Sequence, residues 1–234
     1  MAKGEIKISI DEMTEAGVNF GHKVSKLHPK MKQYVSGIKN NVHTFDLDKT
    51  ALELQKALNY ISRLVSEGKQ IVFVGTKIQL KGIVKSAAEE CGVPYVTERW
   101  LGGTFTNFET ISKRVAYYKE LETKKQTGEL EKYTKKERLM FDKELAILKT
   151  KFEGIKNMAK LPDAVFIFDL SKDDICAKES IIKKIKIVGI ADSNVNPEIA
   201  DYAIPANDDA ISSVSYILEK VTEVILNAKE SAKK

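Results

Sequence analysis

Residues 95–128, YVTERWLGGTFTNFETISKRVAYYKELETKKQTG, begin as a short β-rich strand and end as a long basic helix. Between the two stand Trp100, the only Trp of the chain, and the glycine pair Gly102-Gly103. Glycine has no Cβ, so such a pair lets a chain leave a strand at an angle that other residues resist. We therefore expect a helical segment to be inserted into a strand-and-helix domain at this point.

The predicted insertion covers residues 105–160. Its apolar residues follow one another at spacings of three and four, the pattern of the seam between two packed helices. They are Phe108, Ile111, Val115 and Tyr118 on the way out, and Phe141, Leu145, Leu148, Phe152, Ile155 and Ala159 on the way back. The polar residues 123–136 between them form the turn, so we predict an antiparallel α-helical coiled-coil hairpin.

The remainder, residues 1–104 and 161–234, reads as one α/β domain. Short apolar runs are the mark of strands that are buried on both faces, and here they lie at 71–75, 94–96, 164–170, 185–192 and 202–205. Helical patterns or loops follow them. This alternation predicts a flavodoxin-like parallel sheet with helices on both faces.

Local signals place several boundaries within this domain. Asn40-Asn41 predicts a hairpin turn, and Asp48 is the expected N-cap of a helix over 48–67. Gly92 is expected to end the helix that precedes the strand at 94–96.

Composition excludes several protein classes. The chain of 234 residues has no apolar run near the roughly 20 residues of a membrane span, and its first residues lack the pattern of a signal peptide. We expect a cytoplasmic protein without a membrane partner and without homo-oligomer formation. Cys91 and Cys176 lie far apart in helical stretches, so we expect buried thiols rather than a disulfide or a cysteine metal site.

The net charge of +5 is unevenly distributed. Residues 112–160 carry 14 basic and 8 acidic side chains, a net charge of +6, whereas residues 161–234 carry a net charge of −4. A second basic segment, 21–41, contains Lys23, Lys26, Lys30, Lys32 and Lys39 and no acid. Two basic regions on a nearly neutral body indicate a polyanionic partner. The alternative is that the charges only keep a long helix solvated.

The predicted carboxyl ends of the strands carry residues that could serve catalysis. Ligands of parallel sheets bind beyond the carboxyl ends of the strands, where Lys77, Asp169 and Asp192 are expected. However, no glycine-rich phosphate loop follows any strand, and no Ser or Cys occupies a strand-turn-helix elbow. The His and Cys residues show no metal-ligand spacing. We therefore predict no catalytic residue, no metal and no cofactor.

Six motifs in order resemble a known family. They are AGVNFGHKVSKLHPKMKQYV, VHTFDLDKT, FVGTK, ERWLGGTFTNFETI, LPDAVFIFD and ADSNVNPEIADYAIPANDDA. In sequence and spacing they are similar to the bacterial form of the second protein of the small ribosomal subunit, from about Glu15 to Val221. Each motif alone is weak, but six in register are highly specific.

This resemblance implies a structural, non-enzymatic protein of translation. It implies binding to small-subunit ribosomal RNA between the head and the body of the subunit. It also implies contacts with neighbouring ribosomal proteins and docking of the largest small-subunit protein. The residues expected to contact RNA are Lys23, Lys26, Lys30, Lys32, Arg99, Trp100, Asn107, Lys113, Arg114, Lys135, Lys136 and Arg138. Trp100 either stacks on a base or plugs the base of the hairpin.

Two other classes of protein stay open from the residues alone. One is a small-molecule enzyme with a flavodoxin-like site that uses Asp169 and Asp192. The other is an adaptor whose coiled-coil hairpin binds a protein rather than RNA.

Overall fold

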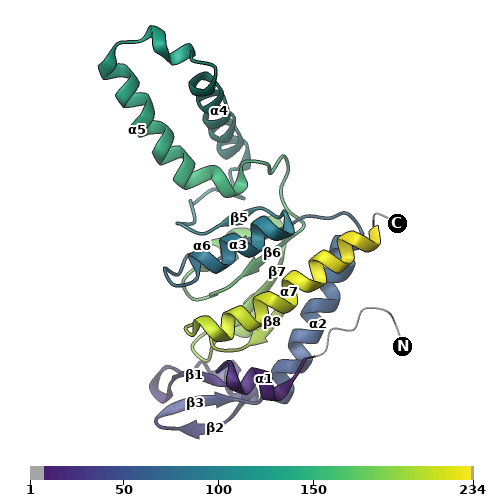
Figure 1. The fold of residues 1–234 in the computed structure, drawn as a ribbon. Helices are drawn as coiled ribbons and strands as arrows, with labels where there is room; N and C mark the ends of the chain where they lie inside the picture. The colour runs from purple at the N-terminus through teal and green to yellow at the C-terminus, as the bar shows by residue number, and fades with distance from the viewer. Residues whose placement is uncertain (1–7, 233–234) are drawn as a thin grey trace.

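The computed structural model describes residues 8–232 and shows a central sheet covered by helices, from which two long helices project (Figure 1). The sheet is parallel, with strand order β5-β4-β6-β7-β8. Counted along the chain this order is 2-1-3-4-5, that of flavodoxin-like folds. The predicted α/β class is confirmed. The strands are β4 (Ile71–Val74), β5 (Tyr95–Val96), β6 (Ala164–Ile167), β7 (Lys186–Ala191) and β8 (Tyr202–Pro205).

Helices cover both faces of this sheet. Alternate strand residues point to opposite sides, so the apolar strands present apolar side chains on both faces that helices must bury. Phe73 of β4 belongs to a core with α2 (Leu47–Ser66), α3 (Lys81–Cys91) and α7 (Ile211–Ala232). The adjacent Val74 belongs to a second core with α6 (Asp174–Lys183). Every residue of β4 and β6 is buried, which explains why these strands read as continuous apolar runs.

Two helix boundaries test the local predictions. The structure ends α3 at Gly92, whose left-handed φ of 58° confirms the expected role. The predicted cap of α2 was wrong by two residues. Asp46, not Asp48, caps the helix, and its Oδ1 accepts a hydrogen bond from the Lys49 amide at 3.4 Å. Both residues are suitable caps, and the end of strand β3 at Phe45 decides between them.

The N-terminal part forms a second, antiparallel sheet with the order β1-β3-β2, following the short helix α1 (Ile10–Glu15). Asn40 and Asn41 have φ values of 51° and 62° and form the predicted turn between β2 (Val35–Lys39) and β3 (Val42–Phe45). Strand β1 (Phe20–Lys23) was not predicted, because FGHK has neither alternation nor β-branched residues. Two 3₁₀ segments, Val24–Lys26 and Pro29–Tyr34, join β1 to β2.

The projecting helices are α4 (Phe108–Gln126) and α5 (Lys135–Phe152), joined through a 3₁₀ turn at Glu129–Lys132. Val115, Tyr118, Leu148 and Phe152 of the predicted seam are buried. The seam does not continue to Ala159, because the chain leaves the helix after a 3₁₀ turn at Glu153–Ile155; Ala159 is exposed and Met158 is buried instead. The coiled-coil character of the pair stays a prediction.

Other expectations concern the thiols and the membrane. Cys91 and Cys176 are free and buried, as predicted. Among residues 8–232, none of the helices is both long enough and apolar enough to cross a bilayer.

The junction between the projecting helices and the sheet is closely packed at Gly154. A Cβ at this position would lie 2.1 Å from the carbonyl oxygen of Tyr95 in β5, a distance that requires the backbone to move. Gly82 of α3 offers the opposite case, because nothing lies within 4 Å of the Cβ that would be added there.

We expect Gly154→Ala to lower the free energy of unfolding by about 1–3 kcal/mol, since the added methyl group overpacks the junction. Gly82→Ala is the matched control and should raise it by up to about 1 kcal/mol through helix propensity. Urea unfolding followed by circular dichroism measures both values. Equal effects of the two substitutions would contradict the close packing of Gly154 against β5.

Candidate nucleic-acid interface and the polar cluster

A polar cluster fills the carboxyl end of the parallel sheet. Lys77, which follows β4, extends its ammonium group to three carboxylates, at 2.9 Å from Asp169, 2.6 Å from Asp208 and 2.8 Å from Asp209. Burial works against the charge of Lys77, but the carboxylates outweigh it and raise its pKa. This lysine was noted in the sequence as a strand-end residue, but its three partners come from loops 92 to 132 residues away.

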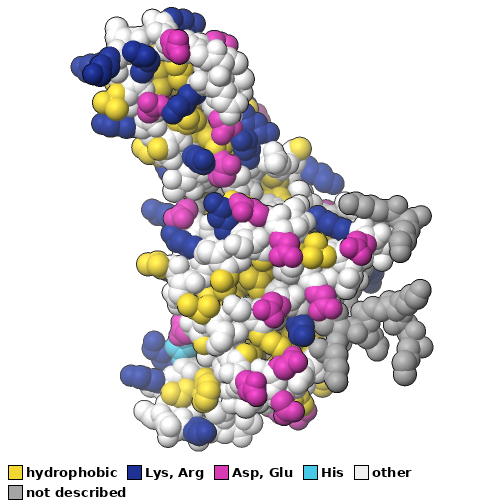
Figure 2. All heavy atoms as spheres, in the orientation of Figure 1, with side chains coloured by type: hydrophobic (Ala, Val, Ile, Leu, Met, Phe, Trp, Pro, Cys, Tyr) yellow, Lys and Arg dark blue, Asp and Glu magenta, His cyan; other side chains and the backbone are white. Residues whose placement is uncertain are grey.

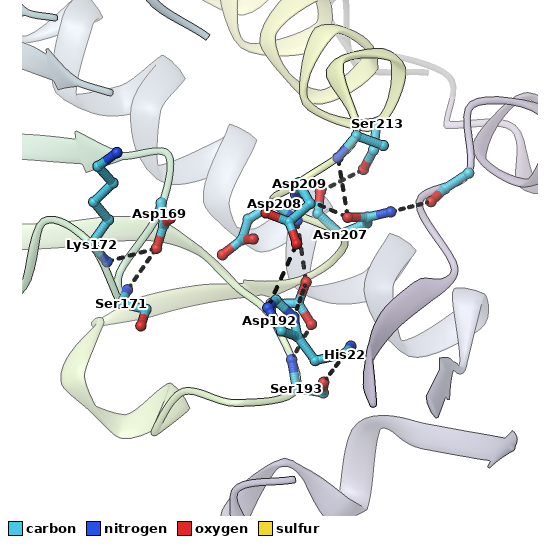
Figure 3. A network of polar contacts seen from close by, with 12 residues as sticks. His22, Asp169, Ser171, Lys172, Asp192, Ser193, Asn207, Asp208, Asp209 and Ser213 are labelled. Carbon is cyan, nitrogen blue, oxygen red and sulfur yellow. Dashed lines mark hydrogen bonds and ion pairs between the residues drawn. The ribbon is translucent and has the colours of Figure 1, made fainter. Parts of the chain in front are cut away.

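The N-terminal segment closes this cluster from the other side (Figure 3). The His22 ring of β1 lies with Nδ1 3.1 Å from Asp192 and Nε2 3.6 Å from Asp209. The His22 amide donates to Ser193 Oγ at 2.8 Å. A Cβ at Gly21 would meet that oxygen at 2.9 Å, so the close approach of β1 depends on glycine.

The space that holds a ligand in many open α/β sheets is therefore filled by the chain itself. Asp169 accepts hydrogen bonds from the Ser171 and Lys172 amides, both at 2.8 Å, and acts as a turn former (Figure 3). Asp192 accepts from the amides of Ser193 and Asp208 at 2.5 and 3.4 Å. These bonds engage the two carboxylates that the enzyme alternative required.

The burial of so many acids shifts their protonation. Burial, together with the charges of Asp169 and Asp192, raises the pKa of Asp208 to about 7. The hydrogen bond from Lys77 lowers the pKa of the neighbouring Asp209, which is more exposed. The hydrogen bond with Asp192 is the largest cause that raises the pKa of His22. Both upward shifts favour the protonated forms of Asp208 and His22, which lowers the negative charge of the cluster.

Three residues of the cluster are suited to hold a cation. One ligand atom each from His22, Asp208 and Asp209 lies within 4.8 Å of the others. Lys77 already supplies a positive charge between Asp208 and Asp209. The arrangement works chemically as a charge-balanced brace between the N-terminal segment and the sheet.

The lysines of segment 21–41 form the first basic surface, at the lower left of Figure 2. Lys23, Lys26 and Lys32 are exposed, and none of them has an ion pair within residues 8–232. Lys30 differs, because its ammonium group pairs with Glu198. The four lysines predicted in this segment therefore lie on β1 and on the 3₁₀ segments that follow it. Of these four, only Lys30 has an ion pair among residues 8–232.

The projecting helices carry the second basic surface (Figure 2). Lys135, Lys136 and Arg138 lie exposed in the first turn of α5 and have no ion pair in the described part of the chain. Basic residues in the first turn destabilise a helix, because its N-terminus carries partial positive charge. A capping box formed by Thr134 and Glu137 offsets this cost in α5. At the base of α4, Arg114 is exposed and has no ion pair with any residue that the structure describes, whereas Lys113 pairs with Glu109 at 2.7 Å.

The three remaining candidates lie at the exit of β5. Arg99 and Asn107 are exposed, and Asn107 accepts a hydrogen bond from Thr110 Oγ1 at 2.9 Å. Trp100 is only 5% exposed and packs edge-on against Phe105 with ring centroids 4.7 Å apart. This position fits the hydrophobic plug of the two interpretations, and contact of Trp100 with RNA stays a prediction.

Glu179 of α6 is a positioning residue at this junction that was not predicted from the sequence. Its buried carboxylate accepts hydrogen bonds from the amides of Gly103, Phe105 and Thr106 at 2.7, 2.9 and 3.0 Å. Trp100 Nε1 and Thr106 Oγ1 donate to it as well, at 3.3 and 3.1 Å. Burial raises the pKa of Glu179, but these donors outweigh it and the net shift is downward. No sequence signal marks this acid among the charged residues of α6.

Asp208 makes stability depend on pH in a direction that can be checked. Its pKa in the folded state, about 7, lies above the ordinary value of 3.8, so the folded state keeps a proton that the unfolded chain releases. The stabilisation from this proton is complete below the ordinary pKa of 3.8 and is lost as the pH rises through 7. Between these values the free energy of unfolding falls by up to about 1.4 kcal/mol per pH unit.

We expect Asp208→Asn to flatten the stability profile between pH 4 and pH 7, because Asn stays neutral throughout. Asp209→Asn is the matched control on the next residue. Because the pKa of Asp209 is lowered, its titration changes the free energy of unfolding only below its ordinary pKa of 3.8. Urea unfolding at several pH values gives the profiles, and a steep profile retained in Asp208→Asn would contradict the shift.

Two kinds of comparison with known proteins agree with each other. The family model described as ribosomal protein S2 matches residues 13–228, which is most of the chain. The chain is also 42% identical over 218 residues to the small ribosomal subunit protein uS2 of Francisella tularensis subsp. novicida, covering 93% of this chain and 91% of that protein. The chain therefore belongs to the ribosomal protein S2 family, whose members are structural, non-enzymatic proteins of the small ribosomal subunit that serve translation.

Proposed function

We propose that this chain binds small-subunit ribosomal RNA through two separate basic surfaces on opposite ends of the molecule. The first consists of Lys23, Lys26, Lys30 and Lys32, and the second of Lys113, Arg114, Lys135, Lys136 and Arg138. The observation that carries the proposal is that seven of these nine side chains have no ion pair within residues 8–232. Free ammonium and guanidinium groups neutralise phosphates and release counterions.

The filled sheet end supports the same conclusion. Lys77 and His22 lie where a small-molecule ligand binds in related α/β folds, so the surface rather than a cleft carries the function. A-form RNA is recognised largely by backbone shape and 2′-hydroxyl contacts, for which two charged surfaces held apart by a rigid body are suited.

The finer arrangement is part of the proposal. Residues 105–160 form a hairpin that is a separate unit from the α/β domain of 1–104 and 161–234, and its helices pack as a coiled coil. The RNA contacts lie between the head and the body of the small subunit. Buried Val115 and Tyr118 of α4 and Leu148 of α5 support a packed helix pair.

Neighbouring proteins are proposed as further partners, including the largest protein of the small subunit. The support comes from α5, where Leu139, Met140 and Ile147 are 56%, 62% and 55% exposed. Large apolar side chains that face solvent in this way mark protein contacts more often than RNA contacts. The adaptor activity considered from the sequence is thereby combined with RNA binding rather than opposed to it.

We expect Lys23, Lys26, Lys30 and Lys32, changed together to Gln, to weaken binding to a small-subunit RNA fragment and to flatten its salt dependence. Each lost phosphate contact lowers the log-log slope by about 0.7–0.9. Lys30 should contribute least, since Glu198 already neutralises it. Filter binding at several salt concentrations measures the slope.

The matched control changes four lysines that each lie near an acid elsewhere, Lys56, Lys69, Lys85 and Lys220. It removes the same charge, so a general electrostatic effect would change both slopes equally. A slope that is unchanged in the first variant would remove segment 21–41 from the interface.

A further inference from the structure

A groove between α3 and α7 lies apart from both basic surfaces. It has a volume of about 710 Å³, within the range of binding sites. Its apolar lining includes Ile83 and Ala87 of α3 and Ile211, Leu218 and Leu226 of α7. Figure 2 shows hydrophobic side chains gathered between these two helices, with acidic side chains beside them. Contiguous apolar surface of this kind marks an interaction site.

The rim of the groove is acidic. Glu90 of α3 and Glu219 and Glu223 of α7 line it and are exposed, and no Lys or Arg is among the lining residues. These three carboxylates have no ion pair within the part of the chain that the structure describes. They are therefore available to a cationic partner.

The lysines of the same helices are engaged elsewhere. Lys81 and Lys85 of α3 pair with Glu98 and Glu89, and Lys85 lines a different pocket, beside β5 and α5. Lys220 of α7 reaches Glu12 of α1 at 3.8 Å, and Lys229 donates to the Cys91 carbonyl oxygen at 2.5 Å. The groove thus presents one sign of charge around an apolar floor, which repels phosphate and excludes RNA from this face.

We propose that this groove docks a basic amphipathic helix of a partner protein. The groove between α3 and α7 has the form that accepts a third helix. Such a helix would insert apolar residues spaced at i, i+3, i+4 and i+7. Lys or Arg residues that flank such a stripe would meet Glu90 on one wall and Glu219 and Glu223 on the other. The docking site goes beyond the proposed RNA contacts and does not depend on them.

Gly82 offers a way to close the groove without harming the fold. It lines the groove, and open space surrounds the Cβ that any other residue would add. Because Gly is the poorest helix former apart from Pro, Gly82→Leu places a bulky side chain in the groove while favouring α3. Gly82→Ala adds only a methyl group and serves as its matched control.

The test uses the full chain and two fluorescent 18-residue helical peptides that share one leucine stripe. One peptide carries Lys at the flanking positions and the other carries Glu. We expect fluorescence anisotropy to show binding of the Lys peptide and at least tenfold weaker binding of the Glu peptide, an order-of-magnitude expectation for reversed rim charges. Gly82→Leu should weaken the Lys peptide by about tenfold or more, whereas Gly82→Ala should change little.

The rim charges are tested separately. Glu219→Gln and Glu223→Gln should each weaken the Lys peptide about two- to fivefold, in keeping with partly exposed charge pairs. Glu230→Gln, on α7 but outside the groove, should leave affinity unchanged. Equal binding of the two peptides, or affinity that survives Gly82→Leu, would overturn the proposal, because the peptide would then bind elsewhere.

A photo-crosslinking residue at Ser86, an exposed lining position, identifies the occupant in assembled small subunits. A crosslink mapped to a Lys- or Arg-rich helical segment of another protein supports the proposal. A crosslink to RNA, to a second copy of this chain or to no macromolecule would overturn it.

Discussion

The carboxylate of Glu179 is the contact on which the placement of the projecting helices depends. It lies on α6, which packs against the second face of the sheet through Cys176 and Ala177. From there it accepts hydrogen bonds from the backbone amides of Gly103, Phe105 and Thr106 in the loop that leads to α4. A buried amide without a partner costs about 1–3 kcal/mol, so the loop would not keep this path alone. These contacts therefore link the sheet through α6 and the loop to α4 and fix the position of α4.

The same fold that houses enzymes elsewhere is used here as a rigid body. In this chain the end of the sheet is closed by Lys77 and by the N-terminal segment that carries His22. The proposed functions accordingly lie at the surfaces, where charge is segregated. Lysines and arginines without an ion pair among residues 8–232 lie on the small sheet and on the projecting helices, and glutamates of the same kind line the groove between α3 and α7. A protein that meets both RNA and protein neighbours benefits from such segregation, because the acidic groove repels phosphate whereas the basic surfaces attract it.

Local patterns were sufficient to predict much of this architecture. Apolar runs located the parallel strands, Gly92 and Asn40-Asn41 located a helix end and a turn, and the Gly102-Gly103 pair located the exit of the projecting helices. Gly103 alone adopts a positive φ, 92°, so only one glycine of the pair meets the conformational need.

What could not be predicted arises from pairs that are distant in sequence. Glu179 accepts from an amide 76 residues away, and Lys77 contacts Asp208 across 131 residues. Lys30 resembled its free neighbours until Glu198, 168 residues away, was found beside it. Periodicity carries no information on such pairing, since it reports only which face of an element is buried. The same limit explains why Trp100 could be read either as a base-stacking residue or as a plug.

Glu179 holds the loop that orients the helices, and amide hydrogen exchange measures this role directly. Glu179→Gln keeps the shape of the side chain but removes its charge and one acceptor oxygen. We expect much faster exchange at Gly103, Phe105 and Thr106 in this variant, while protection in β4 and β6 is retained. Unchanged protection of these three amides would show that the loop is held by packing alone and would contradict the account.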